Sequence, residues 1–597
     1  MFLRSTKRNK DGKEHRYWSV VENVRHADGS VHQRTLLYLG ELNDSQQAAW
    51  IKALEIFNAD SGQTETHSLF PADRTPPPTA SPALSLRLDD YQLSHPRQYG
   101  ACWLACELWR QLGLGQFWAE KLTPSREGTD WARLLLVSTA YRLIAPGSEW
   151  RCHRQWYDQS AMSDLLGPDF QWGGKDQLYF VLDRLLGHRP ALFTHLQARW
   201  QELFGAKYEV LLYDLTSTYV EGQAAEIPKA RFGHSRDHRS DCRQVVIALV
   251  VTPEGFPLAY EVMPGNTSDK TTLREFLATI EKQYGRASRI WIMDRGIPTE
   301  EVLAEMRAAD PPVHYLVGTP RARVAQTRRQ WEALPWQKIK DSVEVKLFRE
   351  GAELYVVAKS GGRQAKEMAM RRKKLARLLW ALRGLRRETS RDRLLLRLGA
   401  AKAKAGRAAS LVEINLPGAA QTKKKKPGQR VAPGGFTFKL KQEELKAAEL
   451  YDGHYLLRSN LSDKEPEWLW KLYILLVEIE AVFKSFKNDL GLRPIYHSVA
   501  PRVEAHIFVC FLAYCLQVTL QQRLRALAPG LTPRAVLETL AGVQMLDLEV
   551  PTTDGRWLVM SRYTRPEPAV ALLLARLKLK LPEQPPPRLS AEKKLTT

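Results

Sequence analysis

Three acidic residues far apart in the sequence have the side-chain type and local setting of a two-metal phosphoryl-transfer site. Asp214 in LLYDLTSTY and Asp294 in RIWIMDRG lie at or near the end of apolar, strand-like runs, where a side chain can leave a sheet. Glu480 lies in YILLVEIEAVFKSFK, a run with helical periodicity. Two aspartates and a distant glutamate can hold two divalent cations about 3.5–4 Å apart for in-line displacement. The three acids therefore predict nuclease or strand-transfer chemistry.

The helical run puts two further polar residues in register with its acid. Tyr473, Glu480 and Lys487 are spaced seven apart, about two helical turns, so they are expected on one stripe. A phenol and an ammonium flanking an acid suit a site that holds metal and grips phosphate. Glu478 competes for the role of third acid, but it lies roughly 200° away around the helix, and the spacing selects Glu480.

The composition predicts a large, folded, nucleic-acid-binding protein. At 597 residues the chain is too long for one core. The apolar share of 44% and the aromatic share of 9% suit a folded chain. A net charge of +22 and a pI near 9.6 favour polyanionic partners, with a merely basic soluble protein as the alternative.

Cysteine usage and hydropathy predict a cytoplasmic protein with no membrane partner, and the net charge predicts that it associates with the nucleoid when bound to DNA. The six cysteines form no CxxC pair, which argues against a zinc ribbon and a disulfide framework. The first residues lack the apolar core of a signal peptide. The longest apolar stretch runs only from Ile507 to Leu520 and indicates a buried helix.

A polar segment, GHSRDHRSD, invites two interpretations. Its His234, Asp237, His238 and Asp241 could bind zinc if the segment were helical, because histidines four apart share a helix face. Gly233 before a polar run argues against a helix. We therefore expect a loop near the active site that touches DNA or the groups behind the acids.

The order of patterns between residues 209 and 296 predicts an α/β core. The strand EVLLYDLTSTYV, a hairpin around TPEG, the helix TTLREFLATIEKQYG and the strand RIWIMD follow one another. This is the opening order of an RNase H-like fold, in which the first and fourth strands lie side by side and would bring Asp214 close to Asp294. The periodicity alone leaves other α/β arrangements open.

The remaining segments predict the organisation of the chain. Tryptophans recurring in the helical part are expected to pack in cores rather than stack on bases. The basic segments, including Lys423–Lys426 in an expected mobile loop, are expected to contact the DNA backbone, the alternative being a solvated face. The predicted regions are an N-terminal β-hairpin and helix that could contact DNA (1–74), a Pro-rich linker (75–90), a helical, DNA-end-binding region (91–205), the first part of the RNase H-like core (206–305), a β-rich insertion with a basic helical arm (306–455), the second part of the core (456–530), and a C-terminal helical region and tail (531–597).

The chain resembles a DDE transposase of the IS4-like superfamily, in the branch with a large insertion in the catalytic domain. The resemblance covers most of residues 205–520 and rests on the motif Y-x2-R-x3-E-x6-K, together with YDLTSTYVEG, MDRG and LGLRPIYH. It implies that Asp214, Asp294 and Glu480 are the catalytic, metal-binding triad. The implied cofactor is Mg²⁺, with two ions expected and Mn²⁺ as a substitute.

The resemblance also implies DNA contacts. Tyr473 and Lys487 would contact the terminal phosphates of the transposon end. The arginine position of the motif is Leu476, a departure that removes one phosphate contact, and Arg493 or Lys484 could replace it.

In relatives, an aromatic residue upstream of the glutamate helix stacks on a flipped base. The matching segment DGHYLLRSN offers His454 or Tyr455. The implied function is cut-and-paste transposition, in which a homodimer binds terminal inverted repeats in double-stranded DNA, cleaves the ends and joins them to target DNA. The alternatives are an inactive, transposase-derived DNA-binding protein and an RNase H-like nuclease without joining activity.

Overall fold

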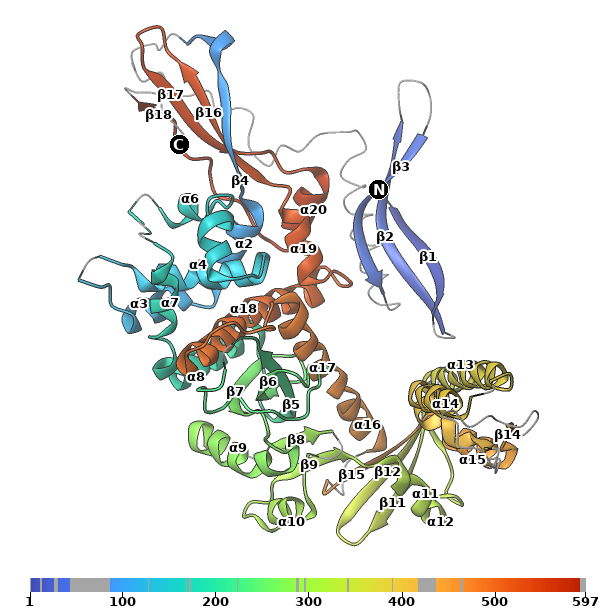
Figure 1. The fold of residues 1–597 in the computed structure, drawn as a ribbon. Helices are drawn as coiled ribbons and strands as arrows, with labels where there is room; N and C mark the ends of the chain where they lie inside the picture. Colours follow the sequence, from blue (N-terminus) through green and yellow to red (C-terminus); the bar gives the residue numbers. More distant parts are fainter. Residues whose placement is uncertain are drawn as a thin grey trace, which may run out of the picture. The chain divides into compact units, whose positions relative to one another are not determined.

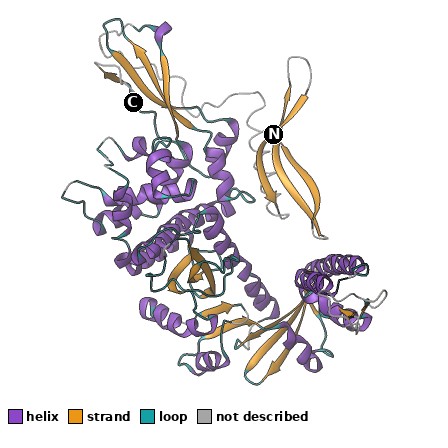
Figure 2. Cartoon of the chain, in the orientation of Figure 1, coloured by secondary structure: helices purple, strands orange, loops and turns teal. Residues whose placement is uncertain are grey.

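The computed structural model describes residues 2–42 and 86–590, except for several short gaps and one longer one (residues 11–12, 26–30, 127, 168, 171, 173, 223, 286–288, 295–296, 341–342, 389, 417–435 and 462–464). Helices and strands both occur throughout, so the expected α/β class is confirmed (Figure 2). The chain forms two compact units. The first comprises Met1–Thr6, Arg16–Arg289 and Leu475–Thr597, and the second comprises Lys7–His15 and Ile290–Ile474.

The centre of the first unit is an antiparallel three-stranded meander (Figure 1). Its strands are β5 (Val210–Val220), β6 (Arg243–Val251) and β7 (Pro257–Pro264). Runs of valine, leucine and isoleucine fill both faces of β6, as expected for a strand buried on two sides. Gly255 has φ +95° in the β6–β7 turn, a conformation that favours glycine. Helix α9 (Asp269–Tyr284) follows, so the predicted order of elements is confirmed.

One long helix, α18 (Ala500–Leu527), is buried in the core of the first unit. Helix α18 is long and apolar enough to cross a membrane, but 89% of its most apolar window is buried inside the protein. Its Phe511 ring packs against Phe193 on one side and Tyr260 of β7 on the other. Helix α18 is therefore a core helix, as predicted.

The helical part of the first unit packs around α18. Its helices are α2 (Gly100–Gln111), α3 (Leu114–Lys121), α4 (Trp131–Ile144), α5 (Glu149–Arg151), α6 (Met162–Leu166), α7 (Asp176–Leu182) and α8 (Arg189–Phe204). Trp118 and Trp200 are fully buried, and Trp200 donates a hydrogen bond to Thr519 of α18 at 3.0 Å. These two tryptophans pack in the core, as predicted.

The two regions predicted to be helical, 91–205 and 531–597, also contain strands that pair with each other. Strand β4 (Gln92–Gln98) pairs with β16 (Gln544–Pro551), and β17 (Trp557–Tyr563) and β18 (Arg588–Ser590) complete a four-stranded sheet. The C-terminal region therefore combines this sheet with α19 (Pro533–Leu540) and α20 (Pro568–Arg576). The pairing joins residues some 450 positions apart, which local periodicity cannot reveal.

The N-terminal region contains three strands, one more than the predicted hairpin. These are β1 (Phe2–Lys10), β2 (Lys13–Arg25) and β3 (Val31–Glu41), with β2 and β3 antiparallel. The helix expected after them and most of the Pro-rich linker lie outside the described residues. Within the predicted linker, Leu88–Asp90 form a short 3-10 turn.

The second unit contains a mixed sheet. Its strands run in the order β10, β11, β12, β15, β9 and β8, antiparallel except for the parallel pair β8–β9. Their bounds are Gln337–Lys340, Val343–Glu350, Glu353–Ser360, His454–Ser459, His314–Gly318 and Ile290–Met293, respectively. The covering helices are α10 (Glu300–Ala308), α11 (Arg321–Gln326), α12 (Arg328–Trp331) and α16 (Pro466–Ile474).

The basic helical arm predicted within the insertion is present and follows strand β12 of the mixed sheet. Helix α13 (Gly361–Leu385) has 25 residues and packs on α14 (Arg391–Ala405) through leucines. A short hairpin, β13 (Val412–Asn415) and β14 (Thr437–Leu440), and helix α15 (Gln442–Leu450) follow. Each of the two longest insertion strands has only eight residues. The predicted loop at Lys423–Lys426 lies outside the described residues.

The helix expected over Tyr473–Lys487 is interrupted. Helix α16 ends at Ile474, α17 runs over Leu476–Lys484, and Ser485–Asp489 form a π-helical turn. A π-turn adds a residue to the helical repeat, so a spacing of seven no longer keeps side chains on one stripe. The single helix expected to carry Tyr473, Glu480 and Lys487 on one stripe is therefore broken twice, between Ile474 and Leu476 and at the π-turn after Lys484.

Candidate active site

Asp214 lies in the middle of β5, on the sheet face that α17 covers. Its neighbour two positions on, Thr216, shares that face because strand side chains alternate. Thr216 lines a small cavity with Phe483 of α17 and with Phe486. The Asp214 side chain is half-buried, and its Oδ1 accepts a hydrogen bond from the Leu215 backbone N–H at 2.7 Å.

Glu480 is carried by the helix that packs on this face. Helix α17 buries Leu476, Ile479, Val482 and Phe483, and this apolar stripe packs the helix onto the sheet. Glu480 lies one turn before Phe483, and its side chain is exposed. Within the described part of the chain it forms no ion pair or hydrogen bond. Packed elements of the first unit thus carry Asp214 and Glu480.

Asp294 directly follows β8 in the second unit. Its exposed side chain has no hydrogen-bond or ion-pair partner among the described residues. The carboxylate is thus free to bind a ligand at a strand end, the position that the sequence predicts.

The competing acid has a structural partner. The Glu478 carboxylate lies 2.8 Å from the Arg525 guanidinium of α18, with both side chains more than a third exposed. Arg525 also donates a hydrogen bond to the Glu254 carbonyl at 2.9 Å. The Glu478 side chain therefore forms an ion pair between α17 and α18, whereas Glu480 forms no ion pair with another described residue.

Two of the predicted phosphate-binding cations meet at one carboxylate. Lys487 Nζ lies 2.9 Å from Asp237 Oδ1, and Arg493 pairs with the same oxygen. Arg493 also donates a hydrogen bond to Asn488 at 2.9 Å. The Asp237 side chain is 5% exposed and that of Lys487 is 11% exposed, so the ion pair is largely shielded from water. Two cations against one carboxylate leave this cluster with a net positive charge.

The surroundings of Lys487 weaken its hold on its proton. Burial lowers the pKa of the Lys487 ammonium, and the charges of Arg493 and Arg236 lower it further, while Asp237 opposes them. Asp237 Oδ2 is buried without a hydrogen-bond partner among the described residues. The cluster is therefore poised to accept a further anion near its cations, because one carboxylate only partly offsets their charge.

The GHSRDHRSD segment is a loop, as predicted. Asp237 is committed to Lys487 and Arg493, and Asp241 pairs with Arg239 at 2.9 Å. Residues of this segment do not belong to the group of metal-ligating side chains that the described part of the chain brings together. The loop interpretation is therefore favoured over zinc binding.

The other predicted phosphate contacts are differently placed. Lys484 is exposed on α17. Leu476, at the position where the motif has arginine, is 8% exposed and packs in the core. Leu476 therefore contributes to helix packing rather than to a phosphate contact.

The predicted aromatic contacts lie in the second unit, on two faces of its sheet. Tyr455 lies 6.1 Å from Tyr473 and 5.3 Å from Trp470, measured between ring centroids, and the Arg363 guanidinium stacks over the Tyr455 ring at 4.1 Å. His454 points the other way, toward Trp331 and Trp336. The structure thus groups Tyr455 with Tyr473 and separates His454 from both.

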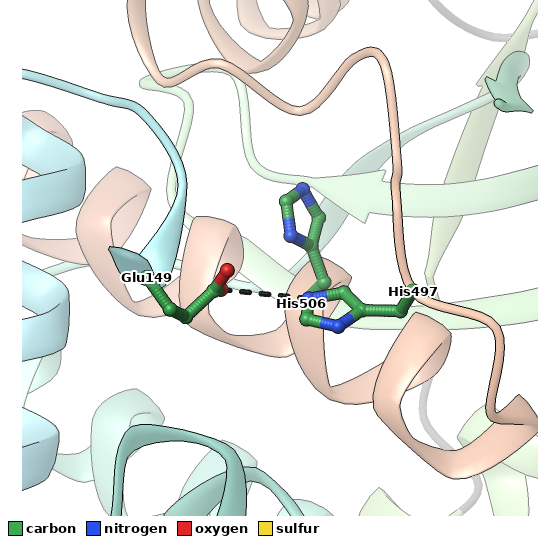
Figure 3. Close-up of side chains that lie close together, drawn as sticks. All are labelled: Glu149, His497 and His506. Carbon is green, nitrogen blue, oxygen red and sulfur yellow. Dashed lines mark ion pairs between the residues drawn. The ribbon is translucent and has the colours of Figure 1, made fainter. Parts of the chain in front are cut away.

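A second polar cluster lies within the first unit (Figure 3). The cluster consists of Glu149 on α5, His497 in the segment before α18, and His506 on α18, and their ligand atoms lie within 4.8 Å of one another. The Glu149 carboxylate lies 3.4 Å from His497 Nε2, and Arg142 Nη2 lies 3.8 Å from the same carboxylate. His506 Nδ1 lies 3.4 Å from Arg142, and its Nε2 lies 3.3 Å from the Leu492 carbonyl.

The electrostatics of this cluster do not favour a metal ion. Burial raises the pKa of Glu149, but His497, His506 and Arg142 outweigh burial and lower it to about 2. Burial, with the charges of Arg142 and His497, holds the pKa of His506 well below its usual value. Arg142 already balances the carboxylate and occupies one His506 nitrogen, so an added dication would meet a buried guanidinium. The cluster is best described as a network joining α4 and α5 to α18.

Sequence patterns missed Asp237 as the partner of the predicted phosphate-binding cations. Its partners lie about 250 residues away, and one sequence offers no signal for so distant a pairing. The only local hint is an acid placed among the basic residues of SRDHRSD.

The chain belongs to the DDE transposase family. The family model described as the transposase DDE domain matches residues 205–516, more than half of the chain and including all three acids. Residues 3–55 match a second model, the N-terminal domain of IS1634 family transposases, which is consistent with the IS4-like superfamily. The chain is therefore an insertion-sequence transposase, and the predicted class of enzyme is confirmed.

Two other comparisons complete the picture. No curated protein matches the sequence. A solved structure described as the piggyBac transposase synaptic complex with hairpin DNA is similar over 75% of this chain and 82% of its own, with 9% identity and a TM-score of 0.33, a remote similarity.

Proposed function

We propose that this transposase cleaves the ends of its own element and joins them to target DNA, with Asp214, Asp294 and Glu480 as the metal-binding catalytic triad. The observation that carries the proposal is the match to the DDE domain over all three acids. The first unit supports it by carrying Asp214 on the sheet face that α17, with Glu480, covers.

The three side chains suit a hard divalent ion. Carboxylate oxygens are the ligands that Mg²⁺ prefers, and Mg²⁺ keeps sites open for water and substrate phosphate. Two Mg²⁺ ions, or Mn²⁺ as a substitute, would activate a water or a 3′-hydroxyl and stabilise the departing oxygen. The exposed Glu480 and Asp294 carboxylates have no ion pair to break among the described residues before binding such ions.

The cations beside this site have a separate task. Lys487 and Arg493 are held together by Asp237 before DNA is present. Side chains ordered in advance lose less entropy when a phosphate binds. The departure at Leu476 is thereby offset by Arg493, and exposed Lys484 supplies a further contact.

The aromatic group of the second unit is the better candidate for base stacking. Tyr455 lies beside Tyr473, the tyrosine of the Y…E…K motif, whereas His454 faces the opposite side. Of the two candidates we therefore assign the flipped base to Tyr455.

The rest of the proposal rests on the resemblance to DDE transposases. Residues 91–205 are assigned to recognition of the transposon ends, and the basic insertion to contacts with DNA phosphates. A homodimer holding two ends and the target DNA completes the proposal, together with a cytoplasmic, nucleoid-associated location.

The test uses linear duplex DNA carrying the inverted repeats that flank the coding region. The expected result is Mg²⁺- or Mn²⁺-dependent cleavage at the repeat ends, followed by joining to a plasmid. Binding without cleavage would favour the inactive DNA-binding alternative. Cleavage without joining would favour the nuclease.

A further inference from the structure

One tryptophan on the helical arm is left in water. Trp380 of α13 is 78% exposed, the highest value for a large hydrophobic side chain in the described part of the chain. The arm folds through Leu375, Leu378 and Leu382, which pack toward α14 on the other side of the helix. The fold of the arm therefore does not use Trp380.

Cations flank this tryptophan on both sides along the helix. Lys373, Arg377 and Arg383 stand at positions i−7, i−3 and i+3, within about 60° of Trp380 around the helix axis. All three are exposed, and none is in an ion pair with another described residue. Glu367, the one carboxylate of α13, pairs with Arg363 at 2.8 Å. The stripe is thus cationic, with an aromatic ring at its centre.

This pattern suits a nucleic-acid strand better than a protein. From Lys373 to Arg383 the stripe spans roughly 15 Å of helix, enough to meet more than one phosphate. A second copy of this stripe carries the same cations, so two stripes that met face to face would repel each other. An aromatic ring between cations can stack on a base whose backbone those cations hold.

We propose that this stripe binds DNA carrying an unpaired base, with Trp380 stacked on the base and Lys373, Arg377 and Arg383 on the flanking phosphates. The inference rests on the proposed action on DNA and adds a second stacking site, separate from the one assigned to Tyr455. An intact duplex offers little to Trp380, because each base is already stacked on both faces. The stripe would therefore distinguish distorted from continuous DNA without reading sequence.

The test measures binding of the full chain by fluorescence anisotropy without divalent metal. The two probes are a continuous duplex and the same duplex with a short unpaired stretch. Trp380→Ala should weaken binding to the second probe about tenfold and leave binding to the first within about twofold. Trp380→Phe should retain most of the affinity, because a ring can still stack. Leu396→Ala removes a side chain that is 77% exposed on α14 and should change neither affinity.

Several results would overturn the inference. These are wild-type affinity of Trp380→Ala for both probes, an equal loss on both, or a change in oligomeric state that accounts for the loss. Cleavage of element ends, measured on the same preparations, separates this inference from the proposed function. If the protein cleaves element ends but Trp380→Ala binds both probes like the wild type, only the stacking site is rejected. If Trp380→Ala selectively loses binding to the probe with the unpaired stretch, but the wild-type protein does not cleave element ends, only the proposed function is rejected.

Discussion

Replacing Glu480 by Gln should abolish catalysis without unfolding the protein. The amide keeps the size of the side chain but removes one negative charge from the proposed metal site. Because Glu480 is exposed and pairs with no other described residue, the free energy of unfolding should change by less than about 0.5 kcal/mol. Affinity for transposon ends should also survive, since it rests on cations spread over both units.

The loss of rate follows from electrostatics near a protein surface. A unit charge about 4 Å from a charge that develops in the transition state contributes about 4 kcal/mol at an effective dielectric constant of 20. Each 1.4 kcal/mol corresponds to about tenfold in rate, so cleavage should fall by about a thousandfold. Strand joining should fall equally, because the same site performs both steps.

Glu478→Gln is the matched control on the same helix. It breaks the 2.8 Å ion pair with Arg525, but both side chains are more than a third exposed, so the cost is at most about 1 kcal/mol. Arg525 keeps its hydrogen bond to the Glu254 carbonyl. Cleavage should remain close to that of the wild-type protein.

The assay follows cleavage of end-bearing duplex DNA on denaturing gels, with binding measured in parallel by gel shift and stability by urea unfolding. Loss of cleavage in the Glu478 variant with retention in the Glu480 variant would refute the assignment of the third acid. Loss of stability in the Glu480 variant would show that the side chain has a structural partner.

Three further predictions concern binding and stability. Asp237→Asn leaves the ammonium of Lys487 buried beside Arg493 without its carboxylate, and urea unfolding should show a loss of about 3 kcal/mol, an unchanged midpoint being contrary evidence. In thermal unfolding, stability should decline as the pH falls below 6.5, because the unfolded chain protonates His506 more readily than the folded protein does. It should decline further as the pH falls from 4.5 towards 2, because the folded protein keeps Glu149 ionised whereas the unfolded chain protonates it. Glu149→Gln should remove this second decline. Deleting Lys423–Lys426 should weaken binding equally for matched and scrambled DNA and lower its salt dependence, and a loss confined to the matched end would make the segment a sequence reader.

Local patterns were sufficient where short-range physics decides the outcome. The apolar run around Asp214 forms a strand because both faces are buried, and the TPEG turn forms the hairpin that glycine at positive φ permits. The choice of Glu480 over Glu478 rested on local register and stays a prediction, and the structure pairs the Glu478 carboxylate with Arg525. The placement of Asp294 directly after a strand follows from the same kind of pattern.

Long-range pairing and helix defects could not be predicted from one sequence. The π-turn that begins at Ser485 shifts Lys487 off the stripe and toward Asp237, and no residue in SFKND marks such a turn. The β4–β16 pairing joins distant segments whose alternation is weak, since the described β4 is mostly exposed. Both depend on tertiary packing, which overrides local preference.

The state of the acidic side chains is compatible with the proposed metal site. Lys and Arg outnumber Asp and Glu by 88 to 66, so most carboxylates in such a chain can find a cation. Glu478 and Asp237 do so, whereas Glu480 and Asp294 have no ion-pair partner within the described ranges. A carboxylate held by arginine would have to break that pair before binding a dication. The unpaired Glu480 and Asp294 carboxylates need break no ion pair to bind metal, while Asp237 orders the two cations that we propose to contact DNA.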